Sequence, residues 1–498
     1  MRPRCRAVLL PALLFMAGCT VGPDFERPSA LDKAGYGVGA AQQQTASTAV
    51  PGGAAQRVTP DRDVPAEWWT LFHSPALDRL ISAALKNNPN LTAAEAALRQ
   101  AHELTLAGEG ALFPSVAANV SATRNKTAAT LSPATANGSL YYSLYSAGLT
   151  VSYVPDLFGG TRRQIEVLAA QEEAQRFALE AAYLTLTSNL VAAAVTEAAL
   201  RGQIAATEEI IGVQRQSLDI LRRQQALGQV AGADVAAQEA ALAQAESALP
   251  PLQKQLAQQR NLLTTLAGKF PSEPPGETFE LSSLRLPQEL PLSLPSRLVE
   301  QRPDIRAAAA ELHAASAGIG VAIAARLPQI TLSANPGLTA TTLGQLFAPG
   351  AAFWSAGGSA VQSLFDAGTL FHKQQAAEAA FDQAAATYRA TVQAAFQNVS
   401  DALHAIDIDA KALQTAAAAN EAAAKSLAIA QRQLRLGAIN YLGVLTAENA
   451  YAQARINLVI AQAARFADTA ALYQALGGGW WNRNDLALSR RARPSSPL

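Results

Sequence analysis

The chain has 498 residues, of which 49% are hydrophobic and 16% are charged, and its 39 basic and 39 acidic side chains leave no net charge. A nucleic-acid-binding protein needs a basic face that displaces counterions, so this balance argues against a nucleic-acid partner. Both cysteines, Cys5 and Cys19, lie in the first 19 residues, which excludes a disulfide framework further along. The five histidines are scattered without metal-ligand spacing, so we expect no metal and no dissociable cofactor.

The N-terminus is typical of an exported lipoprotein. Three arginines precede a short apolar run, too short to span a bilayer, that ends in Met16-Ala17-Gly18-Cys19. Small residues before such a cysteine resemble a bacterial lipobox, and Thr20 in place of aspartate favours export to the outer membrane. We therefore predict a signal peptide over residues 1–18 and a covalent lipid on Cys19. A plain signal peptide with an incidental cysteine is the alternative.

Residues 19–65 are predicted to form the lipid anchor and an extended tether. After the lipobox this stretch is rich in Ala, Gly, Gln, Ser and Thr and has little apolar mass. No later run of 18 apolar residues exists, so we expect no membrane-spanning helix.

An internal repeat organises the rest of the chain. We assign a first repeat to residues 66–270, a proline-rich linker to 271–295, a second repeat to 296–478 and a C-terminal tail to 479–498. Short motifs recur in the same order, and the matched motifs are Asn88-Pro89 with Arg302-Pro303, Pro114 with Pro328, Leu157-Phe158-Gly159 with Leu364-Phe365-Asp366, Gly228 with Gly437, and Gly268 with Gly477. Segments that keep their length between repeats should be regular elements, and the variable one should contain loops.

Each repeat contains one segment with an unbroken seven-residue pattern. It runs from Leu157 to Gly228 in the first repeat and up to Gly437 in the second, and no proline interrupts it. This pattern predicts a coiled-coil helix of roughly 70 residues, about 105 Å long. The two shorter segments of each repeat nearly match it in combined length. We therefore expect one long helix to lie against two shorter ones, with a tight turn at Gly228 or Gly437.

Strand pairs are predicted at about 114–154 and about 328–364. Leu149, Val151 and Tyr153 alternate with polar residues, and so do Ile330 and Leu332. One apolar and one polar face is typical of a membrane β-barrel, although half of a soluble sheet gives the same pattern. Four strands cannot close a barrel, and lipid does not tolerate an open edge, so the barrel must be shared between chains. Three copies would supply twelve strands.

An ordered set of motifs resembles the outer-membrane efflux protein family, the TolC-like proteins, and in particular the lipid-anchored branch that serves resistance–nodulation–division pumps. The motifs are Cys19-Thr20-Val21-Gly22-Pro23-Asp24-Phe25, Arg27-Pro28, Trp68-Trp69-Thr70-Leu71-Phe72, Arg302-Pro303-Asp304-Ile305 and Tyr473-Gln474-Ala475-Leu476-Gly477-Gly478-Gly479-Trp480. The fold class expected is mixed and mainly α. The resemblance implies a homotrimer in the cell outer membrane, with a 12-stranded β-barrel and a periplasmic tunnel of coiled-coil helices. It further implies docking on a periplasmic adaptor (membrane fusion) protein and an inner-membrane pump.

Two groups of candidate functional residues follow from this resemblance. The turns at the far ends of the long helices resemble the family's adaptor-docking tips, and the residues assigned to them are Leu227, Gly228, Val230, Leu436, Gly437 and Ile439. A leucine ring at the position of Leu442 narrows the aperture in the family, and a buried coiled-coil leucine is the alternative. Asp234, Glu239 and Glu448 would form acidic rings at this gate if they faced the lumen, and would otherwise be solvated surface charges.

The sequence departs from the family where ion pairs often lock the gate, because Thr446 and Asn449 replace an aspartate and an arginine. No phosphate loop or nucleophile elbow occurs in the right context, so we expect no enzyme. Two other functions stay open: a duct for polypeptides, and a coiled-coil surface scaffold without transport. The lipobox favours a duct for small molecules.

Overall fold

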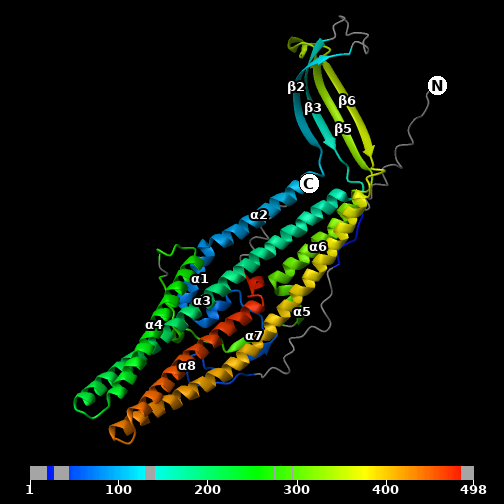
Figure 1. Ribbon diagram of the computed structural model, residues 1–498. Coiled ribbons are helices and arrows are strands. Elements are labelled where there is room, and N and C mark those ends of the chain that lie inside the picture. Colours follow the sequence, from blue (N-terminus) through cyan, green and yellow to red (C-terminus); the bar gives the residue numbers. More distant parts are fainter. Residues whose placement is uncertain (1–19, 27–43, 129–140, 274–275, 294, 484–498) are drawn as a thin grey trace, which may run out of the picture. The chain divides into compact units, whose positions relative to one another are not determined.

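Figure 1 shows the computed structural model of the chain, which describes residues 20–26, 44–128, 141–273, 276–293 and 295–483. The signal peptide and Cys19 lie outside the described residues. The chain is mainly helical with a few strands, as predicted. It forms two compact units, and the boundary between them falls within long helices: the first unit holds Met1–Pro28, Ala97–Gln175 and Ala308–Tyr388, and the second holds Ser29–Ala96, Arg176–Ala307 and Arg389–Leu498.

The internal repeat appears as equal helix lengths in the two halves. Each half has a helix of 22 residues, one of 67 and one of 35, in that order; these are α2 (Pro89–Gly110), α3 (Gly160–Ala226) and α4 (Gly232–Leu266), and then α6 (Pro303–Ala324), α7 (Thr369–Arg435) and α8 (Tyr441–Ala475). A 67-residue helix is about 100 Å long. The predicted long helices and their shorter companions are therefore confirmed.

The seven-residue pattern marks the buried side of the long helices. In α3, Leu190, Ile211 and Leu218 are buried, and so are Val392 and Ile406 in α7. By length and composition alone, parts of α3 and α6 are apolar enough to cross a membrane, although the sequence shows no unbroken apolar run of 18 residues. About half of each apolar stretch is buried in the protein, as in the core helices of a coiled coil.

One repeat landmark was placed incorrectly from sequence. We matched Gly159 with Asp366, but the left-handed glycine before α7 is Gly368, with φ of 83° against 75° at Gly159. The hairpin registers agree with this shift. Ser152 lies opposite Ser115 at the start of the first hairpin, and Val361 lies opposite Gln329 at the start of the second, so Ser152 and Val361 are equivalent. The same spacing in sequence relates Gly159 to Gly368. The two loops thus repeat the backbone conformation, whereas the Leu-Phe sequence motif of the second loop is displaced by two residues.

The first unit contains a four-stranded antiparallel sheet in the order β2-β3-β5-β6 (Figure 1). Its strands are β2 (Ser115–Lys126), β3 (Tyr141–Tyr153), β5 (Gln329–Ala340) and β6 (Ala352–Val361), within the ranges predicted. The register places apolar side chains on one face: Val116, Val120, Leu149, Val151, Ile330, Leu332 and Trp354. The other face is polar, and there Asn119 Nδ2 donates to Thr150 Oγ1 at 2.9 Å. The predicted two-faced strands are confirmed.

The second unit contains a small parallel sheet that the sequence did not predict. Strand β1 (Arg57–Pro60) pairs with β4 (Glu289–Leu292), so part of the expected tether pairs with part of the expected linker. Two further helices lie in this unit, α1 (Pro75–Asn87) and α5 (Pro295–Gln301). The buried Arg465 of α8 holds the tether through Gln56 Oε1, at 2.7 Å. This part of the expected tether is therefore fixed to the second unit and is not a free linker.

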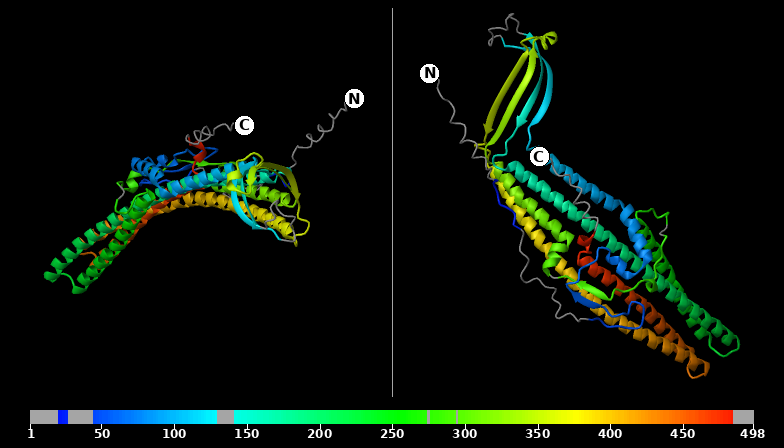
Figure 2. Two further views of the ribbon diagram at one scale, coloured as in Figure 1. Left: turned by 90° about the horizontal axis from the view of Figure 1, so that it is seen from above. Right: turned by 180° about the vertical axis from the view of Figure 1, so that it is seen from behind.

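Aromatic side chains form the centre of this second unit. Trp68 is fully buried and stacks on Tyr473 with ring centroids 5.4 Å apart. The Trp68-Trp69 and Tyr473 motifs of the sequence are therefore packing elements. Figure 2 shows the two helical hairpins, α3–α4 in green and α7–α8 in orange, extending from this region of the unit to their turns.

Candidate functional site

The two hairpin turns have the same hydrogen-bonded geometry. Gly228 and Gly437 both have φ of 72°, a left-handed conformation that favours glycine. The amide of Gln229 donates to Gln224 O at 2.9 Å, and the amide of Ala438 donates to Gln433 O at 2.9 Å. These bonds define a Schellman motif that satisfies the last carbonyl groups of α3 and α7. The sequence prediction of tight turns at these glycines is confirmed.

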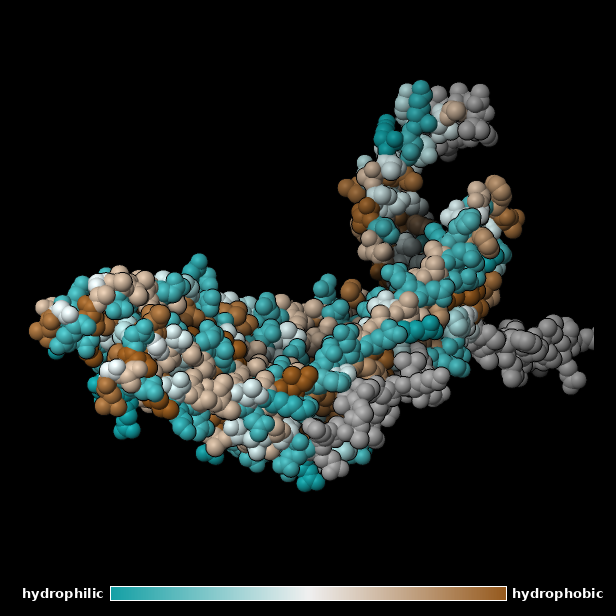
Figure 3. All heavy atoms as spheres, turned by 60° about the horizontal axis from the view of Figure 1, so that its bottom comes forward, coloured by the Kyte–Doolittle hydropathy of each residue, from teal (hydrophilic) through white to brown (hydrophobic). Residues whose placement is uncertain are grey.

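Apolar side chains project from these turns. Leu227 is 73% exposed and Leu436 is 77% exposed, and the hairpin ends carry apolar patches in Figure 3. Val230 and Ile439 point the other way and pack against a buried cluster that joins the two hairpins. Of the predicted docking residues, the leucines are thus available to a partner, whereas Val230 and Ile439 chiefly support the turns.

Replacing Gly228 with alanine is expected to lower the free energy of unfolding by about 1–2 kcal/mol, because its left-handed backbone is unfavourable for an L-residue. Gly212, inside α3, is the matched control, since a Cβ there would meet open space. Gly212→Ala should be neutral or stabilising by up to about 1 kcal/mol. Thermal unfolding followed by circular dichroism measures both variants, and equal effects would contradict the role of Gly228 in the turn.

Leu442 is the second residue of α8. It lies two positions after the N-cap residue Asn440, whose side chain accepts from the amide of Gly443. Its side chain is 59% exposed, so within one chain it is not a buried coiled-coil leucine. The neighbouring Tyr441 points into the core instead. This arrangement leaves Leu442 free to line an opening, which stays a prediction.

Glu448 does not lie on the surface, which corrects the expectation of an acidic ring that includes it. Its side chain is 3% exposed, and one oxygen accepts from Ser217 Oγ of α3 at 2.8 Å. Its other oxygen, Oε2, is buried without a hydrogen-bond partner among the described residues. Burial raises the pKa of the Glu448 carboxyl, and the Ser217 bond only partly offsets this.

The other two acidic candidates are accessible. Glu239 occupies the position in α4 that Glu448 occupies in α8, but it is exposed and binds Arg222 Nη2 at 2.7 Å. Asp234 lies in the first turn of α4, where its negative charge interacts favourably with the positive end of the helix dipole. Whether either faces a lumen stays a prediction. At the departures from the family pattern, Thr446 Oγ1 donates to Leu442 O at 2.9 Å and Asn449 is exposed.

Sequence reasoning missed a buried polar cluster beneath the tips. Tyr441 OH donates to Gln238 Oε1 at 2.6 Å, and Gln238 Nε2 donates to Gln214 O at 2.9 Å. Together with Ser217 and Glu448, these side chains connect α3, α4 and α8. The available signal was the spacing of Tyr441 and Glu448, seven residues apart, because this heptad position is buried.

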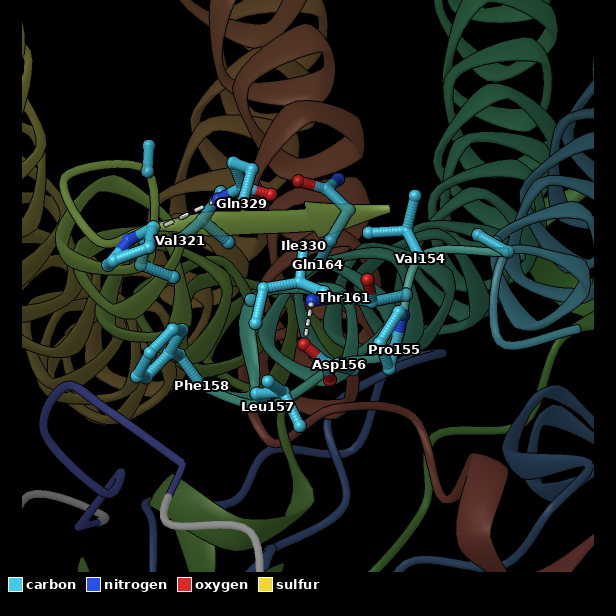
Figure 4. A pocket seen from close by; sticks show the side chains of 16 residues that line it. Val154, Pro155, Asp156, Leu157, Phe158, Thr161, Gln164, Val321, Gln329 and Ile330 are labelled. Carbon is cyan, nitrogen blue, oxygen red and sulfur yellow. Dashed lines mark hydrogen bonds between the residues drawn. The ribbon is translucent and has the colours of Figure 1, made fainter. Parts of the chain in front are cut away.

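A pocket of about 350 Å³ lies in the first unit, between the loop before α3 and the junction of α6 with β5 (Figure 4). Leu157, Phe158 and Ile330 contribute apolar walls. The carboxylate of Asp156 accepts from the amides of Thr161 and Arg162, at 3.0 and 2.9 Å, and so caps α3. The pocket thus offers an apolar lining and a carboxylate that is already engaged. Among the described residues, no group of His, Cys, Asp or Glu side chains could hold a metal ion.

Comparison with known proteins gives concordant matches. The family described as outer membrane efflux protein matches residues 80–269 and 294–478. The chain is 31% identical over 477 residues to the toluene efflux pump outer membrane protein TtgC of Pseudomonas putida, covering 95% of each. It is 31% identical over 420 residues to the pyoverdine export outer membrane protein OpmQ of Pseudomonas putida, covering 83% of this chain and 88% of that one. The solved outer-membrane channel OprN has a TM-score of 0.81 at 29% identity, covering 93% of this chain and 100% of that one.

Proposed function

This chain belongs to the outer membrane efflux protein family, and we propose that it is the outer-membrane duct of a tripartite efflux system. In this role it passes small molecules from an inner-membrane pump and a periplasmic adaptor protein across the periplasm and the outer membrane. The four-stranded sheet carries the proposal, because it has one apolar face, one polar face and two strands at open edges.

Such a sheet suits a lipid environment when its edges are paired. Strands β2 and β6 form the two edges, and their side chains are exposed almost throughout. In a bilayer, unpaired amides at an edge cost several kcal/mol each, so the edges must pair between copies. Three copies give a closed barrel of twelve strands with the apolar face toward lipid and the polar face toward a lumen. We therefore propose a homotrimer in the outer membrane, lipid-anchored through Cys19.

The cargo follows from the relatives. TtgC is named for toluene and OpmQ for pyoverdine, and both are small molecules. We propose a cargo of this class and not polypeptides. A coiled-coil scaffold without transport would account for the long helices but not for a sheet with one apolar and one polar face. A channel acts without bond chemistry, so we expect no enzymatic activity.

The repeat fixes how neighbouring copies should pair. Within one chain β3 pairs with β5, and Val151 lies opposite Ala334. The hairpin registers make Ala360 of β6 the equivalent of Val151, and Val120 of β2 the equivalent of Ala334. If β6 pairs with the β2 strand of the next copy as β3 pairs with β5, Ala360 lies opposite Val120 on the apolar face.

A cysteine pair tests this arrangement, because the mature chain contains no cysteine beyond Cys19. Under mild oxidation, the Val120→Cys, Ala360→Cys variant is expected to run as covalent dimers and trimers on a non-reducing gel, since opposite residues on antiparallel strands lie within disulfide reach. The matched control pairs Val120→Cys with Ser359→Cys, which places the second thiol on the opposite face. A product restricted to monomers in both variants would overturn the shared barrel.

A further inference from the structure

The residues that follow the predicted lipidation site bind a defined surface of the first unit. Thr20 to Glu26 run beside α6 as the short blue segment in Figure 1. The Arg163 side chain, 5% exposed, contacts this segment at three places. Its guanidinium donates to Val21 O at 3.1 Å, to Gly22 O at 3.3 Å and to Asp24 Oδ1 at 2.7 Å. One buried side chain thus binds the backbone and a carboxylate of the same short segment.

A second layer of contacts orients this guanidinium. Glu166 Oε2 accepts from Arg163 Nη1 at 2.8 Å, and Glu166 Oε1 lies 2.8 Å from His313 Nε2 of α6. The ring of Phe25 stacks on the His313 ring, with centroids 4.4 Å apart. Burial opposes ionisation of Glu166, but the bonds from Arg163 and His313 outweigh it and lower its pKa. Glu166 therefore stays charged and holds both partners of the segment.

Glycines on both sides permit a close approach of the two backbones. A Cβ on Gly22 would lie 2.4 Å from Gly320 Cα, and a Cβ on Gly320 would lie 2.8 Å from Val21 O. A Cβ on Gly159 would lie 2.6 Å from Thr20 Cγ2. The amide of Val21 also donates to Phe158 O at 3.1 Å, which continues the contact into the loop before α3. The surface is therefore shaped to this segment.

We propose that this surface, made by Gly159, Arg163, Glu166, His313 and Gly320 and here termed the anchor seat, is a binding site for residues 20–26, with Arg163 as the positioning residue. Its role is to fix where the lipid on Cys19 enters the membrane. Thr20 lies against Gly159, in the loop that joins β3 to α3, and consecutive Cα atoms are about 3.8 Å apart. A seated segment thus attaches the lipid at the helix-proximal end of a barrel strand. The inference deepens the proposed function, because it rests on Cys19 being the anchor.

Hydrogen exchange measured by mass spectrometry on the full, lipidated protein in detergent tests the seat. The Gly320→Ala variant is expected to accelerate amide exchange in residues 20–26 at least about ten-fold, because the added methyl group displaces Val21. Gly318→Ala is the matched control on the same helix, since a Cβ at Gly318 would meet open space. Arg163→Ala should act like Gly320→Ala. Its control is Arg162→Ala, because Arg162 is bound to Asp156 and not to the segment.

The lipid provides a second readout. A photoactivatable fatty acid carried on Cys19 should cross-link to peptides at the ends of β3 and β5 in the native protein, and to dispersed positions in Gly320→Ala. Intact mass should show that both proteins carry the lipid. Unchanged exchange in both Gly320→Ala and Arg163→Ala, or equal acceleration by the control variants, would overturn the seat. The cysteine cross-link between β2 and β6 does not involve these residues, so failure of the seat and failure of the proposed duct are separable.

Discussion

Replacing Leu442 with glycine is expected to raise the single-channel conductance of the protein in planar lipid bilayers several-fold. Leu442 is exposed in the first turn of α8, next to the turn at Gly437, so three copies can present three leucine side chains to one opening. An apolar ring in a narrow aqueous pore excludes water and ions, and its removal lets both pass.

Ala233→Gly is the matched control for this measurement. Ala233 occupies the equivalent position in the first turn of α4, so the substitution places the same residue type at the same place in the other hairpin. Its conductance should remain that of the native protein. If Leu442→Gly also conducts like the native protein, the leucine is a surface residue and the constriction lies elsewhere.

Replacing Glu448 with glutamine is expected to stabilise the protein, and increasingly so as the pH rises. Burial raises the pKa of Glu448 above its ordinary value of 4.5. Below that value the carboxyl is protonated in both the folded and the unfolded chain and contributes nothing. As the pH rises through and above it, the unfolded chain releases the proton while the folded chain retains it, so the native protein loses stability. Glutamine carries no such proton, and it preserves the shape that accepts from Ser217.

The groups that face Glu448 do not reverse this sign. Ser217 of α3 donates a neutral hydrogen bond, and Tyr441 of α8 is itself neutral because burial raises its pKa. We expect a gain at neutral pH of about 1.4 kcal/mol for each unit by which burial raises the pKa of the carboxyl. Thermal unfolding from about pH 4 to about pH 8 measures it, because this interval begins near the ordinary carboxyl pKa and extends well above it.

Glu239→Gln is the matched control, since it changes the equivalent residue in α4. Glu239 is exposed and paired with Arg222, and exposed pairs contribute at most about 1 kcal/mol. Its effect should be small and should not grow with pH in the same direction. If the difference in stability between the native protein and Glu448→Gln stayed constant across this pH range, the carboxyl would be solvated in the assembled protein.

The spacing of prolines and glycines predicts much of the fold. Pro89 and Pro303 each begin a 22-residue helix, and Gly228 and Gly437 each end one of 67 residues, so the element lengths follow from these landmarks. The strands were predictable because apolar and polar residues alternate at Leu149 to Tyr153 and at Ile330 to Leu332. The sheet of β1 and β4 was not predictable, because two four-residue strands are too short to show a period and the strands lie far apart in the sequence, with Arg57 opposite Glu289.

The candidate site was predictable only in part. The turn glycines and the exposed leucines follow from local sequence, but the burial of Glu448 depends on its neighbours. One heptad before Glu448 lies the buried Tyr441, whereas one heptad before the exposed Glu239 lies Gly232, which has no side chain to pack. Equivalent carboxylates in two repeats thus have opposite environments, and no rule on glutamate alone would separate them. Arg163 was missed for a similar reason, because only its partner Glu166 is close in sequence, whereas Val21, Gly22 and Asp24 lie far away in the tether.

The edge strands of the sheet also bear on how the protein reaches its site. A newly exported copy carries two long strand edges beside an apolar face, and such edges pair readily with any other chain that offers a strand. The contacts that close the finished ring are thus the same contacts that would start an aggregate in the periplasm. We expect the yield of the protein in cells to depend on how well a chaperone shields these edges before assembly, and to fall steeply when the chain is produced faster than it can be shielded.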